Sequence, residues 1–494
     1  MKILKIFFAM IIVFSFIFIC GCGGGKGGSS TPASYFPYIT PDDNSNTNSS
    51  NTNNSNNTSK KPWLFLTYFV ADNDDIAIIQ LMQLKELEYV GSDDNTNILA
   101  FIDIGNAKNN IKDLSNYYKI DWIGGRNYYI QKNDSVDSFH SEVIADYGNL
   151  DSADKNFFYK WLKESITKYP ADNICLVLNS HGGAYQGLLY DRGENTYMTN
   201  TDVADAIKKV EEETGSRINV LTLDACLMSN IESLYEYKDS TDYIIASEDV
   251  SYSGAINYEH VLNNSASKSA KSISSKPAII PQAIKTIQNI YTANVESNLK
   301  ISSNVTPKDL AQIIFDTIEK DKSFYLTCSL IDTSKLENLK EAVLSFSQAV
   351  LNTQNTENLL SDMFFGSDEN MTFEYGMEES EEEGIYYSIY YIYDLYDIMN
   401  NIILSKSVTY LDIKESAKKV QEAIEEAVID NINFAFDSDN KYSNSHGISI
   451  FLSSPDYLIY YYDDVKDDST LENYKKLKFV NDSKWYDMLA KLYL

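Results

Sequence analysis

Apolar residues in this chain form short continuous runs that alternate with segments of helical periodicity. The strand-like runs are residues 62–70, 95–105, 173–179, 218–223 and 242–247. Between them, segments 71–90, 157–170, 201–215 and 229–238 place apolar residues every three or four positions, as amphipathic helices do. Strands that alternate with helices through short connections predict an α/β fold with a mostly parallel sheet and helices on both faces.

The pattern is less regular after residue 265. Helical periodicity is present in 335–352, 385–404, 411–430 and 484–494, and strand-like runs cover 323–332 and 446–454. The acidic run Glu378–Glu383 predicts a solvated loop. We therefore expect a C-terminal α/β extension. Within the better-defined part, Thr201 is the expected cap of helix 201–215, and Gly215 is its expected stop.

Two of the apolar strands stop abruptly at residues that can do chemistry. "LVLNSHGG" ends in His181-Gly182, and "LTLDACLMSN" ends in Ala225-Cys226. In a parallel sheet the ligand crevice lies beyond the carboxyl ends of the strands. One helix separates these two strands in the sequence, so we expect them to be close in the sheet and both residues to reach the same crevice.

The other cysteines and histidines compete less well for this role. Cys175 and Cys328 lie within strand runs, where a thiol is a buried apolar filler. His140 and His260 have polar surroundings without a strand end. His446 repeats the Ser-His-Gly triplet, but it precedes its strand, which predicts a place at the opposite rim.

A Cys–His pair at a strand edge has a defined chemistry. A thiol with an ordinary pKa is mostly protonated at neutral pH, and an adjacent imidazole increases the thiolate fraction. The helix expected just after Cys226 would add its dipole. The backbone N–H groups of Gly182 and Cys226 are candidates for an oxyanion hole. Two ordinary strand ends with a buried cysteine remain the alternative at this point.

The first residues resemble an export signal. Lys2 and Lys5 precede an apolar stretch, Ile6–Ile19, which is short for a membrane span. Ile19-Cys20-Gly21-Cys22 then resembles a bacterial lipobox, with residues 1–21 as signal peptide and Cys22 as the lipidated residue. An uncleaved anchor helix is the alternative, although three glycines follow at once. Residues 22–61, rich in Gly, Ser and Asn, predict a flexible tether.

Length and charge restrict the function further. A chain of 494 residues is long for one core. A formal net charge of −30 argues against nucleic acid as a partner. The three cysteines in the folded part of the mature protein imply no disulfide framework. Asp72, Asn73, Asp74 and Asp75 have side chains that can bind a cation, but a helix cap plus a solvated loop explains them better, and we assign no metal or other cofactor.

The motifs together resemble the clostripain family of cysteine peptidases, which belongs to the caspase-like clan. The resemblance rests on "SHGG" followed by "LDAC", and on "YFVADNDDIAIIQLMQLKEL", "YPADNICLVLNSHGG", "ASEDVSYSGAINYEHVL" and "SHGISIFLSS". It spans residues 62–494. It implies a caspase-like peptidase domain over 62–330, with a C-terminal α/β region, 331–494, packed against it.

The resemblance also implies a specificity. Members of the family cleave after Arg or Lys with acidic side chains in the pocket. Asp224 matches one of these acids, while Asn257 stands where a second acid is usual; a simple turn residue is the alternative for Asp224. The family often matures by self-cleavage at a basic residue between His and Cys. Arg192 is the expected site here, with Lys208 and Lys209 as alternatives in a helix.

The sequence therefore predicts an exported, membrane-anchored lipoprotein that acts as a cysteine endopeptidase on peptides or proteins. Its expected catalytic residues are His181 and Cys226. An inactive lipoprotein that binds peptides or a protein partner in the same crevice is the main rival. A structural or adhesive surface protein is a third possibility, favoured only if Cys226 is fully buried and far from His181.

Overall fold

The structure is a computed structural model of the whole chain. It describes residues 60–72, 76–105, 120–135, 138–251, 304–320, 327–365, 374–379, 386–433, 445–458, 460–462, 465–467 and 469–493. Residues 57–494 form one compact unit by their contacts. The signal segment, Cys22 and nearly all of the expected tether lie outside the described residues.

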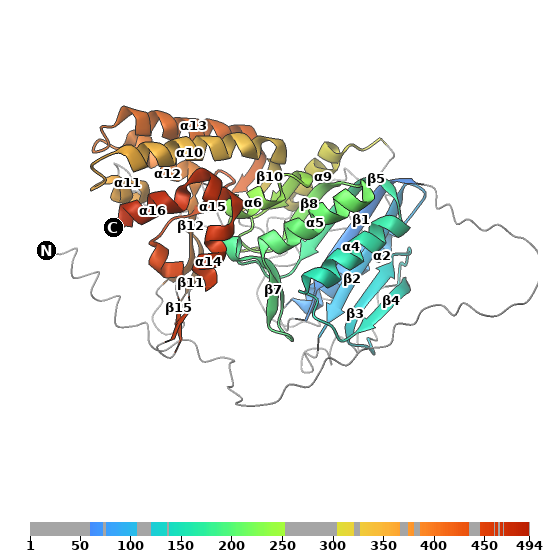
Figure 1. Cartoon of the computed structure of the whole chain (residues 1–494). Helices are drawn as coiled ribbons and strands as arrows, with labels where there is room; N and C mark the ends of the chain where they lie inside the picture. The colour runs from blue at the N-terminus through green and yellow to red at the C-terminus, as the bar shows by residue number, and fades with distance from the viewer. Residues whose placement is uncertain are drawn as a thin grey trace, which may run out of the picture. The chain divides into compact units, whose positions relative to one another are not determined.

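A nine-stranded sheet forms the centre of this unit, with the strand order β13-β10-β9-β8-β5-β1-β2-β3-β4 (Figure 1). Its five middle strands are parallel, and each outer strand pairs antiparallel with its neighbour on the side of the centre. The strands are β1 Lys61–Val70, β2 Thr96–Ile104, β3 Gly124–Tyr129, β4 Glu142–Gly148, β5 Ala171–Asn179, β8 Ile218–Asp224, β9 Thr241–Ala246, β10 Thr327–Asp332 and β13 Val428–Asn433.

Helices cover both faces of this sheet because alternate strand residues are apolar on each side. The helices α4 (Lys155–Lys168), α5 (Asn200–Thr214) and α6 (Ile231–Tyr237) pack on one face together with residues such as Leu176 and Leu221. The helices α2 (Ala77–Val90) and α9 (Pro307–Lys320) pack on the other face, where Val177 and Val220 point. All five strands expected from apolar runs are present, and they form the parallel centre of the sheet.

A small excursion separates β5 from α5. It contains the short 3-10 turn η1 (Ala184–Gln186) and the hairpin of β6 (Leu188–Asp191) and β7 (Thr196–Met198). The following helix is capped by the Thr199 side chain, which accepts a hydrogen bond from the Asp202 N–H. The expected cap at Thr201 is therefore wrong by two residues. Gly215 ends the helix in the left-handed conformation, as expected.

The rest of the chain adds a helical layer and a second sheet. In Figure 1, α10 (Leu336–Asn352) and α13 (Leu411–Ala427) lie side by side. One continuous apolar cluster contains residues of β5, β8 and these two helices. The remaining elements are η2 Thr333–Lys335, α11 Leu359–Phe365, β11 Glu374–Glu379, β12 Tyr386–Asp394, α12 Leu395–Leu404, β14 Ser449–Phe451, η3 Pro455–Leu458, β15 Tyr460–Tyr462, β16 Val465–Asp467, α14 Ser469–Lys476, α15 Lys478–Ser483 and α16 Trp485–Tyr493.

Two expectations for this part need correction. The segment 385–404 is not one helix, because β12 occupies its first half and α12 its second. The run 446–454 contains only a short strand, β14, which joins β11 and β12 in the second sheet and not the central one. The acidic run expected as a loop begins within β11, and Ser380–Glu383 lie outside the described residues.

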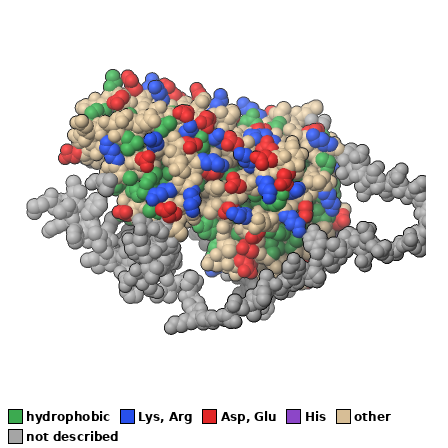
Figure 2. Space-filling model, viewed as in Figure 1, with side chains coloured by type: hydrophobic (Ala, Val, Ile, Leu, Met, Phe, Trp, Pro, Cys, Tyr) green, Lys and Arg blue, Asp and Glu red, His purple; other side chains and the backbone are tan. Residues whose placement is uncertain are grey.

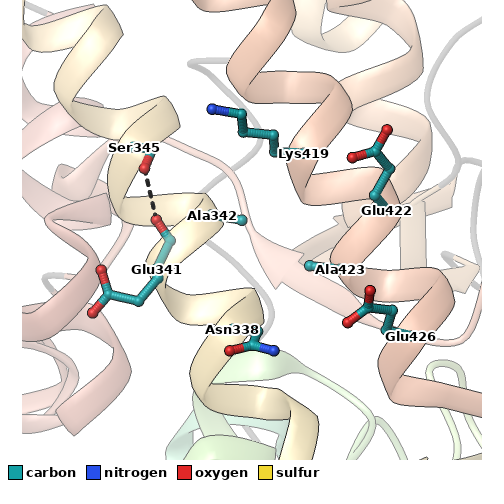
Figure 3. A pocket seen from close by; sticks show the side chains of 8 residues that line it. All are labelled: Asn338, Glu341, Ala342, Ser345, Lys419, Glu422, Ala423 and Glu426. Atoms are coloured by element: carbon teal, nitrogen blue, oxygen red, sulfur yellow. Dashed lines mark hydrogen bonds between the residues drawn. The ribbon is translucent and has the colours of Figure 1, made fainter.

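The visible surface mixes charges of both signs, with Lys and Arg interspersed among Asp and Glu (Figure 2). None of the helices in the described ranges is long and apolar enough to cross a bilayer. A shallow groove of about 320 Å³ runs between α10 and α13 (Figure 3), and Glu341, Lys419 and Glu422 are among its lining residues. It is formed by the outer helices and not by the strand ends that carry His181 and Cys226.

Candidate active site

The loop after β5 carries His181 and is folded back by a short antiparallel bridge. Gly182 pairs with Leu188 in this bridge. Its hydrogen bonds run from the Gly183 N–H to the Gly187 carbonyl, 2.9 Å, and from the Leu189 N–H to the His181 carbonyl, 3.1 Å. These bonds use neither the N–H nor the carbonyl of Gly182. The Gly182 N–H is the first of the two expected oxyanion donors.

Gly182 lies directly against the backbone of Cys226. A Cβ added to Gly182 would approach the Cys226 carbonyl oxygen to 2.2 Å and the Cys226 nitrogen to 3.0 Å. Only a glycine fits at such a distance. The neighbouring strands β5 and β8 produce this approach, since Asn179 pairs with Asp224 in their parallel register. The fold therefore brings the His181–Gly182 loop and the Cys226 loop together.

The sulfur of Cys226 is partly buried and packs against the loop that follows β9. It lies 3.4 Å from both the carbonyl oxygen and the backbone nitrogen of Ser251, so the thiol donates to the former and accepts from the latter. The Ser251 hydroxyl is 4.0 Å away. Sequence reasoning did not find this serine, because nothing in its neighbourhood marks it as a partner of a residue 25 positions earlier.

Burial is the main influence on this thiol and raises the pKa of Cys226. The hydrogen bonds from Ser251 lower the pKa, and the carboxylates of Asp249 and Asp224 raise it further. The net direction is upward, so the protonated thiol is the resting form at neutral pH. A nucleophile in this state needs a base that removes its proton during the reaction.

Strained backbone is concentrated around the two loops. Ala184, Leu189 and Leu227 have φ values of 52°, 61° and 66°, and they make up three of the six non-glycine residues with positive φ in the described ranges. Such conformations cost of order 1–3 kcal/mol each and cluster at functional sites. Leu227 directly follows Cys226, while Ala184 and Leu189 belong to the excursion after His181.

The helix after Cys226 differs from the expectation. It begins only at Ile231, and the side chain of Asn230 caps it by accepting from the Ser233 N–H, 3.0 Å. Cys226 lies five residues before the first helical residue, and a helix-end effect fades within the first turn. The expected help from this dipole to the thiol is therefore wrong.

Asp224 is 3% exposed and is held by amide groups from two other elements. Its Oδ2 accepts hydrogen bonds from the side chains of Gln83, at 3.3 Å, and Asn179. Asn179 also donates to Gln83 Oε1 at 3.2 Å and accepts from Gln80 Nε2. Amide donors around a carboxylate favour its charged form.

The amides that surround Asp224 were missed by the sequence reasoning. Gln80 and Gln83 are 0% and 1% exposed and lie among the leucines of α2. Two polar residues three positions apart on a buried helix face are a signal in themselves, because buried amides need partners. That signal indicates a polar neighbour but cannot identify it as Asp224.

The remaining cysteines behave as expected. Cys175 and Cys328 are fully buried, and burial raises the pKa of each thiol far above its usual range. All three cysteines of the described part are free. His140 is on the surface, where its ring meets the Ser138 hydroxyl at 3.1 Å. His260 lies outside the described residues.

His446 does not lie at the opposite rim, so that expectation is wrong. Ser445 donates a hydrogen bond to Glu248, which lies two residues after the carboxyl end of β9. The Ser449 N–H bonds the Ser229 carbonyl, 2.9 Å, three residues after Cys226. The strand-direction argument failed because β14 belongs to a different sheet, whose strands need not share the direction of the central one.

The remaining candidate residues stay predictions. Arg192 is exposed in the turn between β6 and β7, and its N–H donates to the Asp72 carbonyl, 3.0 Å. Lys208 and Lys209 are exposed on α5. Asn257 lies outside the described residues.

The expected cap of α2 by the acidic segment 72–75 is not observed. The N-cap position is Ile76, which makes no side-chain cap bond. Within the ranges that can be described, no group of three or more His, Cys, Asp or Glu side chains is arranged to hold a metal ion. Of the segment 72–75, only Asp72 belongs to those ranges.

Comparisons with known proteins match most of this chain to one family. The sequence profile of the clostripain family matches residues 68–491. The clostripain of Hathewaya histolytica is 20% identical over 465 residues, which cover 88% of this chain and 83% of the relative.

Solved structures resemble the fold as well. An inactive zymogen C11 protease from Parabacteroides distasonis superimposes with a TM-score of 0.52 at 17% identity, covering 86% of this chain and 99% of that one. A secreted C11 cysteine protease from Bacteroides thetaiotaomicron, solved with an irreversible peptide inhibitor, gives 0.52 at 16% identity with the same coverage. The expected caspase-like, mostly parallel sheet is thereby confirmed.

Proposed function

The chain belongs to the clostripain family of cysteine peptidases, and we propose that it is an active endopeptidase with Cys226 as nucleophile and His181 as general acid and base. The close approach of Gly182 to the Cys226 backbone is the observation that carries this proposal. Since His181 is the neighbour of Gly182, that approach brings the imidazole-bearing loop to the thiol. Cys226 is only partly buried, whereas Cys175 and Cys328 are fully buried.

The reaction follows from the states of the two groups. His181 takes the proton of Cys226 as the sulfur attacks the scissile carbonyl carbon. The N–H groups of Gly182 and Cys226 stabilise the resulting oxyanion. When the C–N bond breaks, His181 gives its proton to the leaving amine. Water then hydrolyses the thioester with His181 as base, which releases the acid product and restores the thiol.

We assign the recognition of a basic residue, Arg or Lys, before the scissile bond to Asp224. The amides of Gln83 and Asn179 support this role, because their N–H groups hold the carboxyl group in place at a position that is 3% exposed. A buried negative charge attracts a cationic side chain that can reach it. Asn257 belongs to the same proposed pocket and supplies a neutral side chain where a second acid would add charge.

Maturation and location complete the proposal. Arg192 is the processing site, which its exposed turn supports, because a peptidase needs an extended segment that a helix such as α5 does not offer. The protein is exported and held at a membrane through lipid on Cys22, with residues 22–61 as tether. Peptides or proteins are the substrates, and nucleic acid is not a partner. The peptidase domain covers 62–330, and 331–494 pack against it.

Two substitutions test the catalytic pair. Cys226→Ala should abolish hydrolysis of a peptide amide with Arg before the scissile bond, and His181→Ala should lower kcat by about a thousandfold or more because the proton acceptor is lost. Cys328→Ala serves as control, since that thiol is fully buried in β10. Full turnover by either of the first two variants excludes the pair.

A peptide-binding protein without activity is separated by chemical labelling. An alkylating peptide probe should react with Cys226 much faster than with Cys175 or Cys328, and the reaction should depend on His181. Equal and slow labelling of all three thiols, with the probe still bound, would support the inactive rival.

A further inference from the structure

We propose that Glu248 is a positioning residue for Cys226, which rests on the proposed role of that thiol, and that it couples the C-terminal segment Ser445–Ser449 to the loop beside the nucleophile. Glu248 is fully buried and lies two residues after the end of β9. Its Oε2 accepts from the Ser445 hydroxyl and from the Gly447 N–H, 3.0 Å.

The loop around Glu248 forms one wall of the Cys226 site. The Leu227 N–H donates to the Asp249 carbonyl, 3.1 Å, and the Ser229 N–H donates to the Ser247 carbonyl, 2.8 Å. Ser251 contacts the sulfur itself. A displacement of segment 247–251 therefore moves the groups that surround the thiol.

The C-terminal segment Ser445–Ser449 forms hydrogen bonds with Glu248 and also with Ser229, in the loop that follows Cys226. Besides its bonds to Glu248, it accepts from the Ser229 hydroxyl at the Gly447 carbonyl, 2.7 Å. Ser445 is 2% exposed, so water does not compete for these bonds. Residues about 200 positions apart in the sequence thus share one buried set of hydrogen bonds.

A second buried carboxyl group, that of Asp394, belongs to the same set of hydrogen bonds. Asp394, at the end of β12, is also fully buried, and it accepts from the Asp397 N–H, 2.7 Å, the His446 N–H, 2.7 Å, and the His446 ring at 3.1 Å. No donor of the described residues reaches Glu248 Oε1, and the side chain of Asp394 lies within hydrogen-bonding reach of the Glu248 side chain. Two buried carboxylates in contact cannot both stay ionised.

The shared proton belongs to Glu248. Burial, and next the charge of Asp394, raise the pKa of Glu248 well above its usual range. Glu248 is then a neutral acid that donates from Oε1 and accepts at Oε2. The titratable groups around it are Asp394 from β12, Tyr375 from β11, His446 from the C-terminal segment and Asp249 from its own loop.

Glu248→Gln is the decisive variant because glutamine reproduces the neutral acid. Its oxygen can accept from Ser445 and Gly447 while its NH₂ donates to Asp394. We expect kcat within about twofold of wild type. A fall of more than about tenfold in a folded Glu248→Gln protein would show that the charge of Glu248 is needed, and it would overturn the neutral bridge.

Glu248→Ala and Ser445→Ala test the coupling from its two ends. We expect kcat to fall about tenfold in the first and about threefold in the second, with KM within about twofold, because the wall shifts and not the substrate pocket. Ser347→Ala is the control, since it removes a buried hydroxyl of α10 that no described group bonds. If Glu248→Ala does not fold, Ser445→Ala still decides the question. Unchanged kcat in Ser445→Ala relative to this control overturns the coupling.

Alkylation of Cys226 by iodoacetamide gives a readout that does not need turnover. Loss of the Ser251 contacts exposes the sulfur, so Glu248→Ala and Ser445→Ala should react severalfold faster at pH 7 than wild type, while Glu248→Gln and Ser347→Ala should match it. If the wild-type protein cleaves no peptide, the proposed function fails, yet these rates still decide whether Glu248 positions the thiol. Equal rates in all five proteins overturn the inference.

Discussion

The two walls of the Cys226 site solve the burial of a carboxyl group in opposite ways. On the α2 side, Asp224 is 3% exposed and is surrounded by amide donors. On the side of β9 and the C-terminal segment, Glu248 is fully buried and its neighbour is another carboxyl. Burial disfavours charge at both places, so the difference comes from the partners. In the proposed function, the first wall offers a carboxylate to a cationic substrate side chain, and in the proposed coupling the second wall holds a proton.

The largest expected effect comes from the contact that the His181 loop makes with the nucleophile. Gly182→Ala should lower kcat/KM by about a thousandfold, because its Cβ would overlap the Cys226 carbonyl and displace an oxyanion donor. Gly183→Ala is a matched control, since the nearest heavy atom to its Cβ is 3.6 Å away on Tyr390. Equal activities of the two variants would show that the close approach does not matter for catalysis.

The second-largest effect is expected from changing the carboxyl group of Asp224, on the α2 wall, to an amide. Asp224→Asn should lower kcat/KM for a substrate with Arg before the scissile bond by about a hundredfold, because a buried cationic side chain loses its charge partner. Cleavage after a neutral residue by the same variant serves as the internal control and should change little. The same chemical change at Glu248 is expected to be nearly neutral. Loss of both cleavages in Asp224→Asn would make Asp224 a structural residue.

The smallest expected effect on catalysis concerns a third buried carboxyl, away from both walls. Burial, and next the charge of Asp191, raise the pKa of Asp103 in β2 to about 8. Since this lies above the unfolded value of about 4, the folded state holds an extra proton between pH 4 and pH 8, and its stability falls as pH rises through that range.

Asp103→Asn removes this titrating group. The free energy of unfolding should then fall less steeply with rising pH, with a slope that is smaller by about 1.4 kcal/mol per pH unit across that range. Urea unfolding at several pH values measures the slope. The kcat of Asp103→Asn should stay within about twofold of wild type, because β1 separates β2 from β5. A slope identical to that of the wild type would place the proton elsewhere.

The centre of the fold could be predicted because its strands are continuous apolar runs. The strands β1, β2, β5, β8 and β9 are buried on both faces, which gives an unambiguous pattern. The outer strands β3 and β4 were not predicted, since "GGRNYY" and "EVIADYG" are short and half polar. The strand β12, "YYSIYYIYD", was taken for helix because an almost continuous aromatic run satisfies both periods.

The two sides of the candidate site also differ in how far the sequence predicts them. Cys226, His181 and Gly182 follow adjacent strands, so strand order alone predicts that they meet. The bonds of Glu248 to Ser445 and Gly447 join β9 to a segment of the second sheet, and no local pattern encodes such a pairing. The rim of His446 was predicted wrongly for this reason. The sequence also offers no sign that Glu248 and Asp394 touch.

The bond between the Ser229 hydroxyl and the Gly447 carbonyl spans 218 positions of the chain. A ribosome has therefore made the cysteine loop long before it makes the segment that completes its surroundings. At the speed of protein synthesis, that interval is on the order of ten seconds or more. The growing chain would pass this time with its thiol in an unfinished setting, so the proposed peptidase would complete its site only after most of the chain has been made.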